Sequence, residues 1–342
     1  MGESKTLLGE ALVEKARQLC EKEGMKGWKL AQETLLKEKA SNPQLQEAIN
    51  YIMLKYQPEY FRPAFVSFCF KAVGGKSTPA VPTGAALTLF AWAIGIHDDI
   101  IDQSKTKDER PTVLGKFGKD LALILSDILL FKGFTLLRKT LESQMSIESF
   151  VRILETIEKI WFEQSVGEAF EIQSKGLVDL TPEECLDKIR MRASEMDACA
   201  RIGGIIGGGS ARQIEVLGKY GRLIGMIGIL RNELIDMLEF DVLKHRIRKE
   251  SLPLPVIYAL QDKSAKSQLV PLITQSRLTK EDLRKISKLS DSFKGTDNVA
   301  TLINKMSREA YMHANSFKDS NLKILAEAFA LESDTWKPLL ED

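Results

Sequence analysis

The sequence is poor in cysteine and histidine and carries almost no net charge. It has four cysteines, three histidines, 48 Lys plus Arg and 47 Asp plus Glu, giving a formal net charge of +1. The cysteines are isolated along the chain, so we expect free thiols in a cytoplasmic protein and no tetrahedral zinc site. A balanced charge provides no overall field for attracting nucleic acid, which we do not expect as a partner. Because cysteine and histidine ligands are scarce, any bound metal should have oxygen ligands.

Proline is absent from two long stretches, 112–181 and 183–252. Because proline interrupts helices, these stretches favour long helices. Their apolar residues recur every three or four positions and show no convincing hairpin pattern. The sequence predicts an all-α protein of ten to fourteen helices. Breaks are expected near 41–43, 74–82, 103–111, 177–182, 207–210 and 294–297.

We expect one large helical bundle. It spans residues 46–342, has charged C-terminal helices, and follows an N-terminal helical extension at 1–45. The longest uncharged run, 77–96, has the length of a membrane span. It contains Pro79, Pro82 and Gly84 and leads directly into acidic residues, so we predict a buried core helix and no transmembrane segment.

The most informative segment is HDDIID at 97–102, at the end of this apolar run. Asp98 and Asp102 are four residues apart and share one helix face, while Asp99 lies about 100° round the axis. Two carboxylates one turn apart repel each other and are costly to desolvate unless cations neutralise them. Such hard oxygen ligands suit Mg²⁺. An isolated DDxxD is more often a solvated acidic helix end, and this alternative stays open.

A second acidic cluster, NELID at 232–236, follows the apolar run 223–230. It places Asn232, Glu233 and Asp236 on one helix face as further oxygen ligands. Basic residues follow each cluster: Lys105, Lys107 and Arg110 after the first, and Lys244, His245, Arg246, Arg248 and Lys249 after the second. Two facing acidic helix ends and closing basic loops can hold several Mg²⁺ ions and a diphosphate.

The ordered motifs resemble those of the trans-isoprenyl diphosphate synthases, or polyprenyl synthetases. They are HDDIID, RPT at 110–112, LGKFG at 114–118, Ser126-Asp127, NELID and KESLP at 249–253, and they cover roughly residues 50–260. The resemblance implies the all-α isoprenoid synthase fold around a central cavity, a homodimer and a magnesium-dependent prenyltransferase. Such an enzyme ionises an allylic prenyl diphosphate in an apolar, water-poor pocket.

The resemblance also implies roles for individual residues. The catalytic set is Asp98, Asp99, Asp102 and Asp236; Asn232 and Glu233 join these four as metal ligands; Arg62, Lys107, Arg110, Arg192 and Lys249 bind diphosphate. By position before Asp98, the side chains of Phe90, Ala93 and Ile94 line the tunnel for the prenyl tail. The small Ala93 side chain leaves room for a substrate of C15 or longer, although Phe90 is equally compatible with ordinary core packing.

Three departures fall on the site that binds isopentenyl diphosphate in the family. The usual GGKxxRP motif is QPEYFRP at 57–63, so Arg62 remains but Glu59 replaces a lysine. Where the family usually has two adjacent arginines after the first acidic motif, this chain has Lys107-Asp108. Ala91 stands where the family usually has a histidine. An acid in place of a phosphate-binding base reverses the sign of the Coulomb interaction. We therefore expect an atypical member with a degenerate isopentenyl diphosphate site.

Three functions remain open on the sequence. The first is a prenyltransferase with an acceptor other than isopentenyl diphosphate. The second is a class I terpene synthase on the same scaffold, favoured by the lost acceptor groups and by Asn232. The third is a non-catalytic subunit of a prenyl synthase, disfavoured by the intact HDDIID. A ferritin-like di-iron protein is strongly disfavoured, because no histidine follows a glutamate by three residues.

Overall fold

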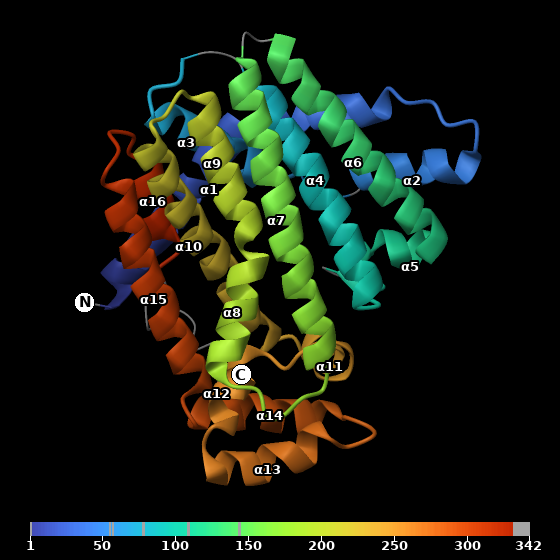
Figure 1. Cartoon of the computed structure of the whole chain (residues 1–342). Coiled ribbons are helices and arrows are strands. Elements are labelled where there is room, and N and C mark those ends of the chain that lie inside the picture. Colours follow the sequence, from blue (N-terminus) through green and yellow to red (C-terminus); the bar gives the residue numbers. More distant parts are fainter. Residues whose placement is uncertain are drawn as a thin grey trace.

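The computed structural model describes residues 2–54, 56, 58–76, 79–107, 110–142 and 145–330, and these form a bundle of helices (Figure 1). The helices are α1 (Gly2–Leu36), α2 (Pro43–Leu54), α3 (Phe61–Ala72), α4 (Ala80–Ile101), α5 (Val113–Phe117), α6 (Lys119–Glu142), α7 (Ile147–Ser174), α8 (Pro182–Arg192), α9 (Ser194–Ile206), α10 (Ala211–Asp236), α11 (Phe240–Lys249), α12 (Leu254–Leu260), α13 (Lys263–Ile273), α14 (Lys280–Ser292), α15 (Gly295–Ala314) and α16 (Asn321–Ala328). The all-α prediction is confirmed.

The helix count and the loop at 103–111 differ from expectation. Sixteen helices lie in the described residues, because short helices such as α5 and α12 form within segments that the periodicity did not divide. The loop contains one small antiparallel hairpin, β1 (Thr106–Lys107) with β2 (Arg110–Pro111). No alternating pattern predicted these two-residue strands, because a ladder this short has no hydrophobic period of its own.

Two predicted breaks are explained by helix caps. Thr181 begins α8 with a capping box that includes Glu184, and Ser210 begins α10 with one that includes Gln213. Each box satisfies two backbone donors that the first helical turn leaves unpaired. Gly208 lets the chain turn between α9 and α10. Its φ of +75° is a backbone conformation that residues with a side chain rarely adopt.

The long helices α4, α6, α7, α9 and α10 run alongside one another and form the body of the molecule (Figure 1). Helices α12, α13 and α14 form a smaller group at one end, with a second core cluster around α12. Helix α4 is the one helix in the described part of the chain long and apolar enough to cross a membrane. Of its most apolar window 67% is buried, as in a core helix.

The N-terminal helix α1 packs against α3, α4 and α16 and adds Trp28, Ala31 and Leu35 to the main core. The expected division at residue 45 falls in the first turn of α2, and it stays a prediction. Helices α3 and α4 approach closely at Gly84, where a Cβ atom would lie 2.8 Å from Cα of Pro63. This contact holds the start of α3 against α4, and Arg62 shares a cavity wall with Asp99 of the first acidic motif.

Candidate active site

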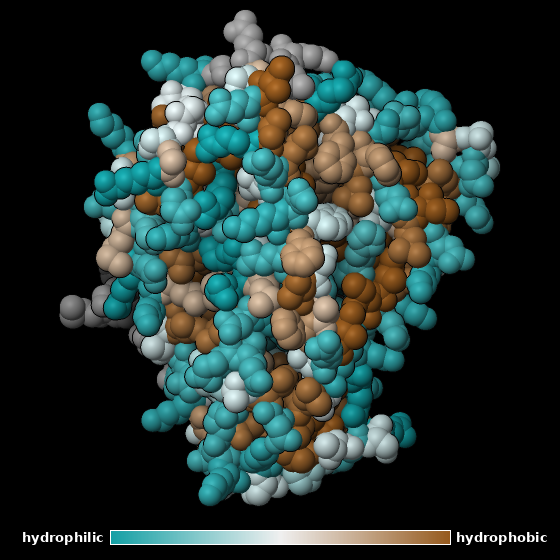
Figure 2. Space-filling view, in the orientation of Figure 1, coloured by the Kyte–Doolittle hydropathy of each residue, from teal (hydrophilic) through white to brown (hydrophobic). Residues whose placement is uncertain are grey.

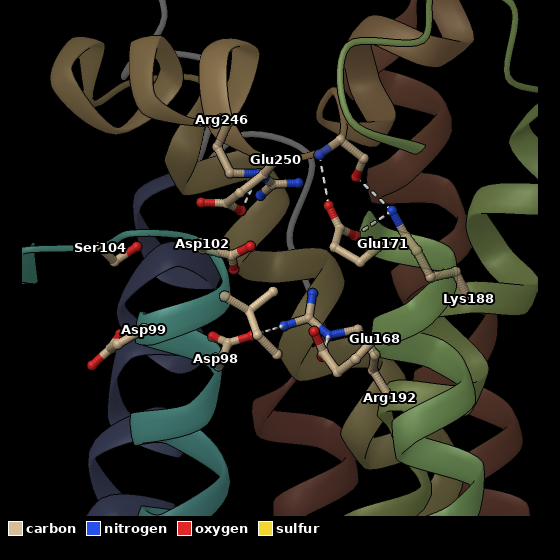
Figure 3. Close-up of polar contacts among 12 residues, drawn as sticks. Asp98, Asp99, Asp102, Ser104, Glu168, Glu171, Lys188, Arg192, Arg246 and Glu250 are labelled. Carbon is tan, nitrogen blue, oxygen red and sulfur yellow. Dashed lines mark hydrogen bonds and ion pairs between the residues drawn. The ribbon is translucent and has the colours of Figure 1, made fainter. Parts of the chain in front are cut away.

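The first acidic motif ends α4 and divides its three carboxylates between two faces. Asp98 and Asp102 point toward α7 and α8, whereas Asp99 points to the other side of the helix (Figure 3). Asp98 accepts a hydrogen bond from Nη2 of Arg192 at 3.1 Å, and Asp102 accepts one from Nζ of Lys175 at 3.2 Å. Asp99 accepts one from Nζ of Lys107 at 2.9 Å. The stacked pair expected from the sequence is therefore Asp98 and Asp102.

Helix α7 brings Glu168 opposite this pair. Oε1 of Glu168 lies 3.0 Å from Nε of Arg192, so Arg192 bridges Glu168 and Asp98 (Figure 3). Oε2 of Glu168 is buried and has no hydrogen-bond partner. Gly167 lets α8 approach, since a Cβ atom there would lie 3.1 Å from Cβ of Met191. An unpartnered buried carboxylate oxygen is rare in folded proteins and identifies an incomplete site.

Glu171, one turn further along α7, anchors a buried network. Nζ of Lys188 lies 2.5 Å from Oε2 of Glu171 and 2.5 Å from Oγ of Ser251. The backbone N–H of Ser251 donates to Oε1 of Glu171 at 2.6 Å. Burial alone would raise the pKa of Glu171, but the lysine and Arg192 lower it to about 2. This network joins α7 and α8 to the segment before α12 and fixes one wall of the site.

The site has a surplus of negative charge. Its ion pairs join eight carboxylates (Asp98, Asp99, Asp102, Glu168, Glu171, Glu233, Asp236, Glu250) with five bases (Lys107, Lys175, Lys188, Arg192, Arg246). Burial, followed by neighbouring carboxylates, raises the pKa of Asp102 to about 6. Burial raises the pKa of Glu168 to about 7 although Arg192 opposes it. At both carboxylates the neighbouring base only partly offsets the effect of burial.

The donors of the first motif fit a hard divalent cation. Asp98 and Asp102 are stacked, and the free oxygen of Glu168 lies at the same wall. In the part of the chain that the structure describes, no three acidic, histidine or cysteine side chains converge into a complete metal cage. Magnesium needs no such cage, because it uses one or two carboxylates and completes its shell with water and phosphate oxygens.

The second acidic motif, predicted as a further metal site, is paired with a base from α11. Glu233 is buried, and its two oxygens accept hydrogen bonds from Nη2 of Arg246 at 2.8 Å and from the backbone N–H of Leu254 at 2.7 Å. Oδ2 of Asp236 accepts one from Nη1 of Arg246 at 2.5 Å. Asn232 is exposed to solvent. A guanidinium therefore lies where the sequence predicted a second metal site.

An apolar cavity of about 430 Å³ adjoins the first motif between α4, α6 and α7. Its wall includes Ile94, Asp98 and Leu123, and also Trp161, whose ring lies edge-on to His97 with centroids 6.5 Å apart. Burial lowers the pKa of His97, and its Nε2 lies 2.9 Å from Oγ of Ser126. The arrangement places a polar head site beside an apolar chamber.

The three residues predicted to line the tunnel lie in this region at different depths. Ile94 lines the cavity, and Ala93 is fully buried, with its carbonyl accepting a hydrogen bond from Ser126. Phe90 is buried and lies edge-on to Phe134, with ring centroids 4.9 Å apart. The assignment of these side chains to a prenyl tunnel stays a prediction.

A second cavity of about 410 Å³ lies on the other face of α4. Its wall includes Tyr56, Ala91, Trp92 and Asp99, and the two aromatic ring centroids lie 5.6 Å apart. It contains the predicted phosphate ligands Arg62, Lys107 and Arg110. Lys249, expected to bind diphosphate as well, is exposed and donates to Oε1 of Gln103 at 3.1 Å.

Arg62 is held by two carboxylates. Nη1 of Arg62 lies 2.8 Å from Oε2 of Glu59, and Nε lies 2.5 Å from Oε1 of Glu195. Glu59 thus replaces the lysine expected at this position, and its carboxylate also pairs with Arg62, the base that remains. Asp108, the other acid in an expected basic position, lies outside the described residues. At least one cation of this cavity is already neutralised by the protein itself.

Residues 42–290 match the family model for polyprenyl synthetase. The chain belongs to this family. A short chain isoprenyl diphosphate synthase of Methanothermobacter thermautotrophicus is 30% identical over 178 residues, 52% of this chain and 54% of that protein. A geranylgeranyl diphosphate synthase of Sulfolobus acidocaldarius is 28% identical over 71% of this chain and 70% of its own. The chain thus spans about half the length of the first relative.

The fold of the family is also shared by solved structures. The geranylgeranyl pyrophosphate synthetase of Pyrococcus horikoshii superposes with a TM-score of 0.77 at 24% identity, covering 96% of this chain and all of the other. A polyprenyl synthase of Caulobacter crescentus, complexed with calcium and isoprenyl diphosphate, has a TM-score of 0.76 at 17% identity, covering 93% and 96%. The isoprenoid synthase fold expected from the sequence is confirmed.

No motif or spacing in the sequence indicated that several residues of this site would contribute to it. Lys175, Lys188 and Glu195 contact the motifs from 73, 63 and 133 residues away. Arg246 belongs to a basic run that predicted a phosphate-closing loop, yet it binds the second acidic motif. Glu171 is one helical turn after Glu168, and that spacing is the single local cue that could have identified it.

Proposed function

We propose that this chain is a magnesium-dependent prenyltransferase that ionises an allylic prenyl diphosphate of C15 or longer and transfers the prenyl cation to an acceptor. One observation carries the proposal: Asp98, which faces Arg192 and Glu168, also lines the apolar cavity of about 430 Å³. A charged head group and an apolar tail can therefore be held side by side. The named activities of the two archaeal relatives support the same substrate class.

In this proposal Asp98 and Asp102 hold Mg²⁺, and the free oxygen of Glu168 accepts a further metal or water contact. Bound Mg²⁺ supplies Lewis-acid stabilisation of the negative charge on the departing diphosphate. The surplus of carboxylates at this wall supports the presence of several ions when the diphosphate is also bound.

The basic residues bind and orient the diphosphate. The side chains of Arg192 and Lys175 are 25% and 27% exposed and pair with Asp98 and Asp102, so each can exchange a carboxylate for a phosphate oxygen. Charge-assisted hydrogen bonds of this kind are strong and directional. The apolar walls around Ile94 and Leu123 offer the prenyl tail and the carbocation an environment with few polar groups.

The acceptor in this proposal is a group without a diphosphate. Arg62 is engaged by Glu59 and Glu195, and Lys107 by Asp99, so a second diphosphate must displace carboxylates to bind. Tyr56 and Trp92 present aromatic surface in the same cavity. Both features favour an uncharged acceptor, and they support the degenerate isopentenyl diphosphate site.

A class I terpene synthase is the second candidate function, favoured by the aromatic ring of Trp161 in the cavity beside Asp98. The face of an aromatic ring stabilises a carbocation, so a cation formed there can be captured within its own chain or by water. The same ionisation step serves both candidates. They differ in what attacks the cation.

One experiment tests the proposed function and separates it from the second candidate. The protein with Mg²⁺ is incubated with C10, C15 and C20 allylic diphosphates, with and without isopentenyl diphosphate, and released diphosphate and organic products are identified. Elongation only when isopentenyl diphosphate is present refutes the degenerate acceptor site. Hydrocarbon or alcohol products without it favour the terpene synthase. No diphosphate release, or release unaffected by Asp102→Asn, refutes both.

We also propose a homodimer formed through α6 and α7, in a cytoplasmic protein. Figure 2 shows hydrophobic surface over these helices, where Phe131, Ile147 and Phe162 are 74%, 76% and 74% exposed. A twofold interface buries the same patch of both copies. Four buried free cysteines support a reducing compartment. Light scattering should report a dimer that Phe131→Asp dissociates, while the control Met312→Asp on α15 leaves it intact.

A further inference from the structure

Arg246 is surrounded by the carboxylates of the second acidic motif. Its guanidinium lies 2.8 Å from Oε1 of Glu233, 2.5 Å from Oδ2 of Asp236 and 2.9 Å from Oε2 of Glu250. The side chain is only 10% exposed. Figure 3 shows the arginine and Glu250 above Asp102, at the wall of the same site. Three carboxylates around one buried cation is the charge arrangement expected of a metal centre.

The surrounding backbone fixes this arrangement. Glu250 is four residues after Arg246, so both project from the C-terminal end of α11. Glu233 also accepts the backbone N–H of Leu254, which ties the segment after α11 to α10. Glu171 holds Ser251 of the same segment from the opposite side. The guanidinium is thereby held between two helices and a pinned segment.

The cations of the first motif are less buried than the guanidinium of the second. Lys175 and Arg192 are more exposed than Arg246, and Lys107 is mostly exposed. Glu168 retains a buried oxygen without a partner. A metal can therefore complete the first motif. At the second it would meet a guanidinium that is always protonated, whose two terminal nitrogens are hydrogen-bonded and whose buried Nε pairs with Glu250 without a hydrogen bond.

We propose that Arg246 takes the place of a metal ion at the second acidic motif, so that this chain binds divalent metal through Asp98 and Asp102 and not through Asp236. The inference rests on the proposed function, because it assumes metal at the first motif. Arg246 acts as a positioning residue that neutralises Glu233 and Asp236 permanently and holds the segment from Glu250 to Leu254 in place. The second motif becomes a structural ion-pair cluster.

The test counts bound Mn²⁺ by the electron paramagnetic resonance signal of the free ion. The full chain is titrated with Mn²⁺ alone and with a C15 thiolodiphosphate, an analogue that cannot ionise. We expect Asp102→Asn to lower the number of bound ions by one and Asp236→Asn to leave it unchanged. A loss of one ion in Asp236→Asn overturns the inference while leaving the proposed function intact.

A second variant gives the converse result. Arg246→Met frees the carboxylates of Asp236 and Glu250, and we expect one additional Mn²⁺ per chain. Arg248→Met is the matched control, because it removes the same charge from the same helix but from a side chain bonded to backbone carbonyls. An unchanged count in a folded Arg246→Met variant contradicts the inference; if that variant does not fold, Asp236→Asn decides. No Mn²⁺ bound to the unmodified chain with the analogue contradicts the proposed function and the inference together.

Discussion

The two faces of α4 differ in charge balance and in the character of their cavities. One face presents Asp98 and Asp102 to α7 and α8, beside a largely aliphatic cavity and a surplus of carboxylates. The other presents Asp99 to Lys107, which also lies 3.6 Å from Oδ2 of Asp98. Aromatic rings and the paired charge of Arg62 line the cavity on that face. The cavities have similar volumes, about 430 and 410 Å³.

This difference shows how adjacent residues can serve different chemistry. Asp98 and Asp99 are one residue apart, but a helix rotates by about 100° per residue and directs them to opposite cavities. We infer that the acid-rich face ionises the allylic diphosphate and that the charge-balanced face receives the acceptor. Substitutions on the two faces should therefore have unequal effects.

The largest effect is expected from Asp102→Asn. Loss of a metal-binding carboxylate should slow diphosphate release by about 10³-fold or more, since removing one preorganised electrostatic contact already costs 10²–10³ in kcat. Steady-state release of diphosphate from a C15 substrate measures this. A loss below tenfold would remove the first motif from the reaction.

Glu59→Lys should restore part of the second diphosphate site. The substitution replaces an acid by a base beside Arg62 and leaves that arginine a single carboxylate partner, Glu195. Hydrogen bonds to charged groups contribute about 1.5–3 kcal/mol, so the Kd for isopentenyl diphosphate should fall by about 10- to 100-fold. Isothermal titration measures the change. Glu59→Gln is the control, and unmodified protein that already binds isopentenyl diphosphate tightly would contradict the charge-balanced acceptor face.

Asp99→Asn should reduce turnover by about tenfold, far less than Asp102→Asn, because its carboxylate accepts a hydrogen bond from Lys107 on the other face of α4, away from the pair to which we assign the metal. The same diphosphate assay compares the two variants side by side. Equal losses would show that both faces of α4 serve one metal centre and that the comparison is wrong.

Phe90→Ala should change substrate length preference by about tenfold. Phe90 fills space beside Gly133 and Phe134, one turn before Ile94, and its removal deepens the cavity. The measurement is the ratio of kcat/KM for C20 and C15 allylic diphosphates. Phe134→Ala, on the more exposed partner ring, is the control. An unchanged ratio in Phe90→Ala would assign Phe90 to core packing alone.

Much of the fold was predictable because helix periodicity is a local property. The proline-free stretches contain α6, α7 and α10, and the capping residues Thr181 and Ser210 begin helices where breaks were expected. The short hairpin at Thr106–Lys107 and Arg110–Pro111 was not predictable, because two-residue strands carry no period.

The candidate site was predictable only in part. The stacking of Asp98 and Asp102 follows from four-residue spacing, and the engaged Arg62 follows partly from Glu59 three residues before it. Glu195 comes from 133 residues further along the chain, and no spacing rule connects it to Arg62.

The sequence by itself determined the helical class, the family and the acidic motifs, since hydrophobic periodicity, motif order and residue spacing can be read along the chain without tertiary contacts. Only the tertiary structure decided which charges meet. It placed Arg246 among the carboxylates of the second motif, placed Glu195 against Arg62 and left Oε2 of Glu168 without a partner. The physical reason is that charges act through space, and helix packing sets those distances between residues far apart in the chain.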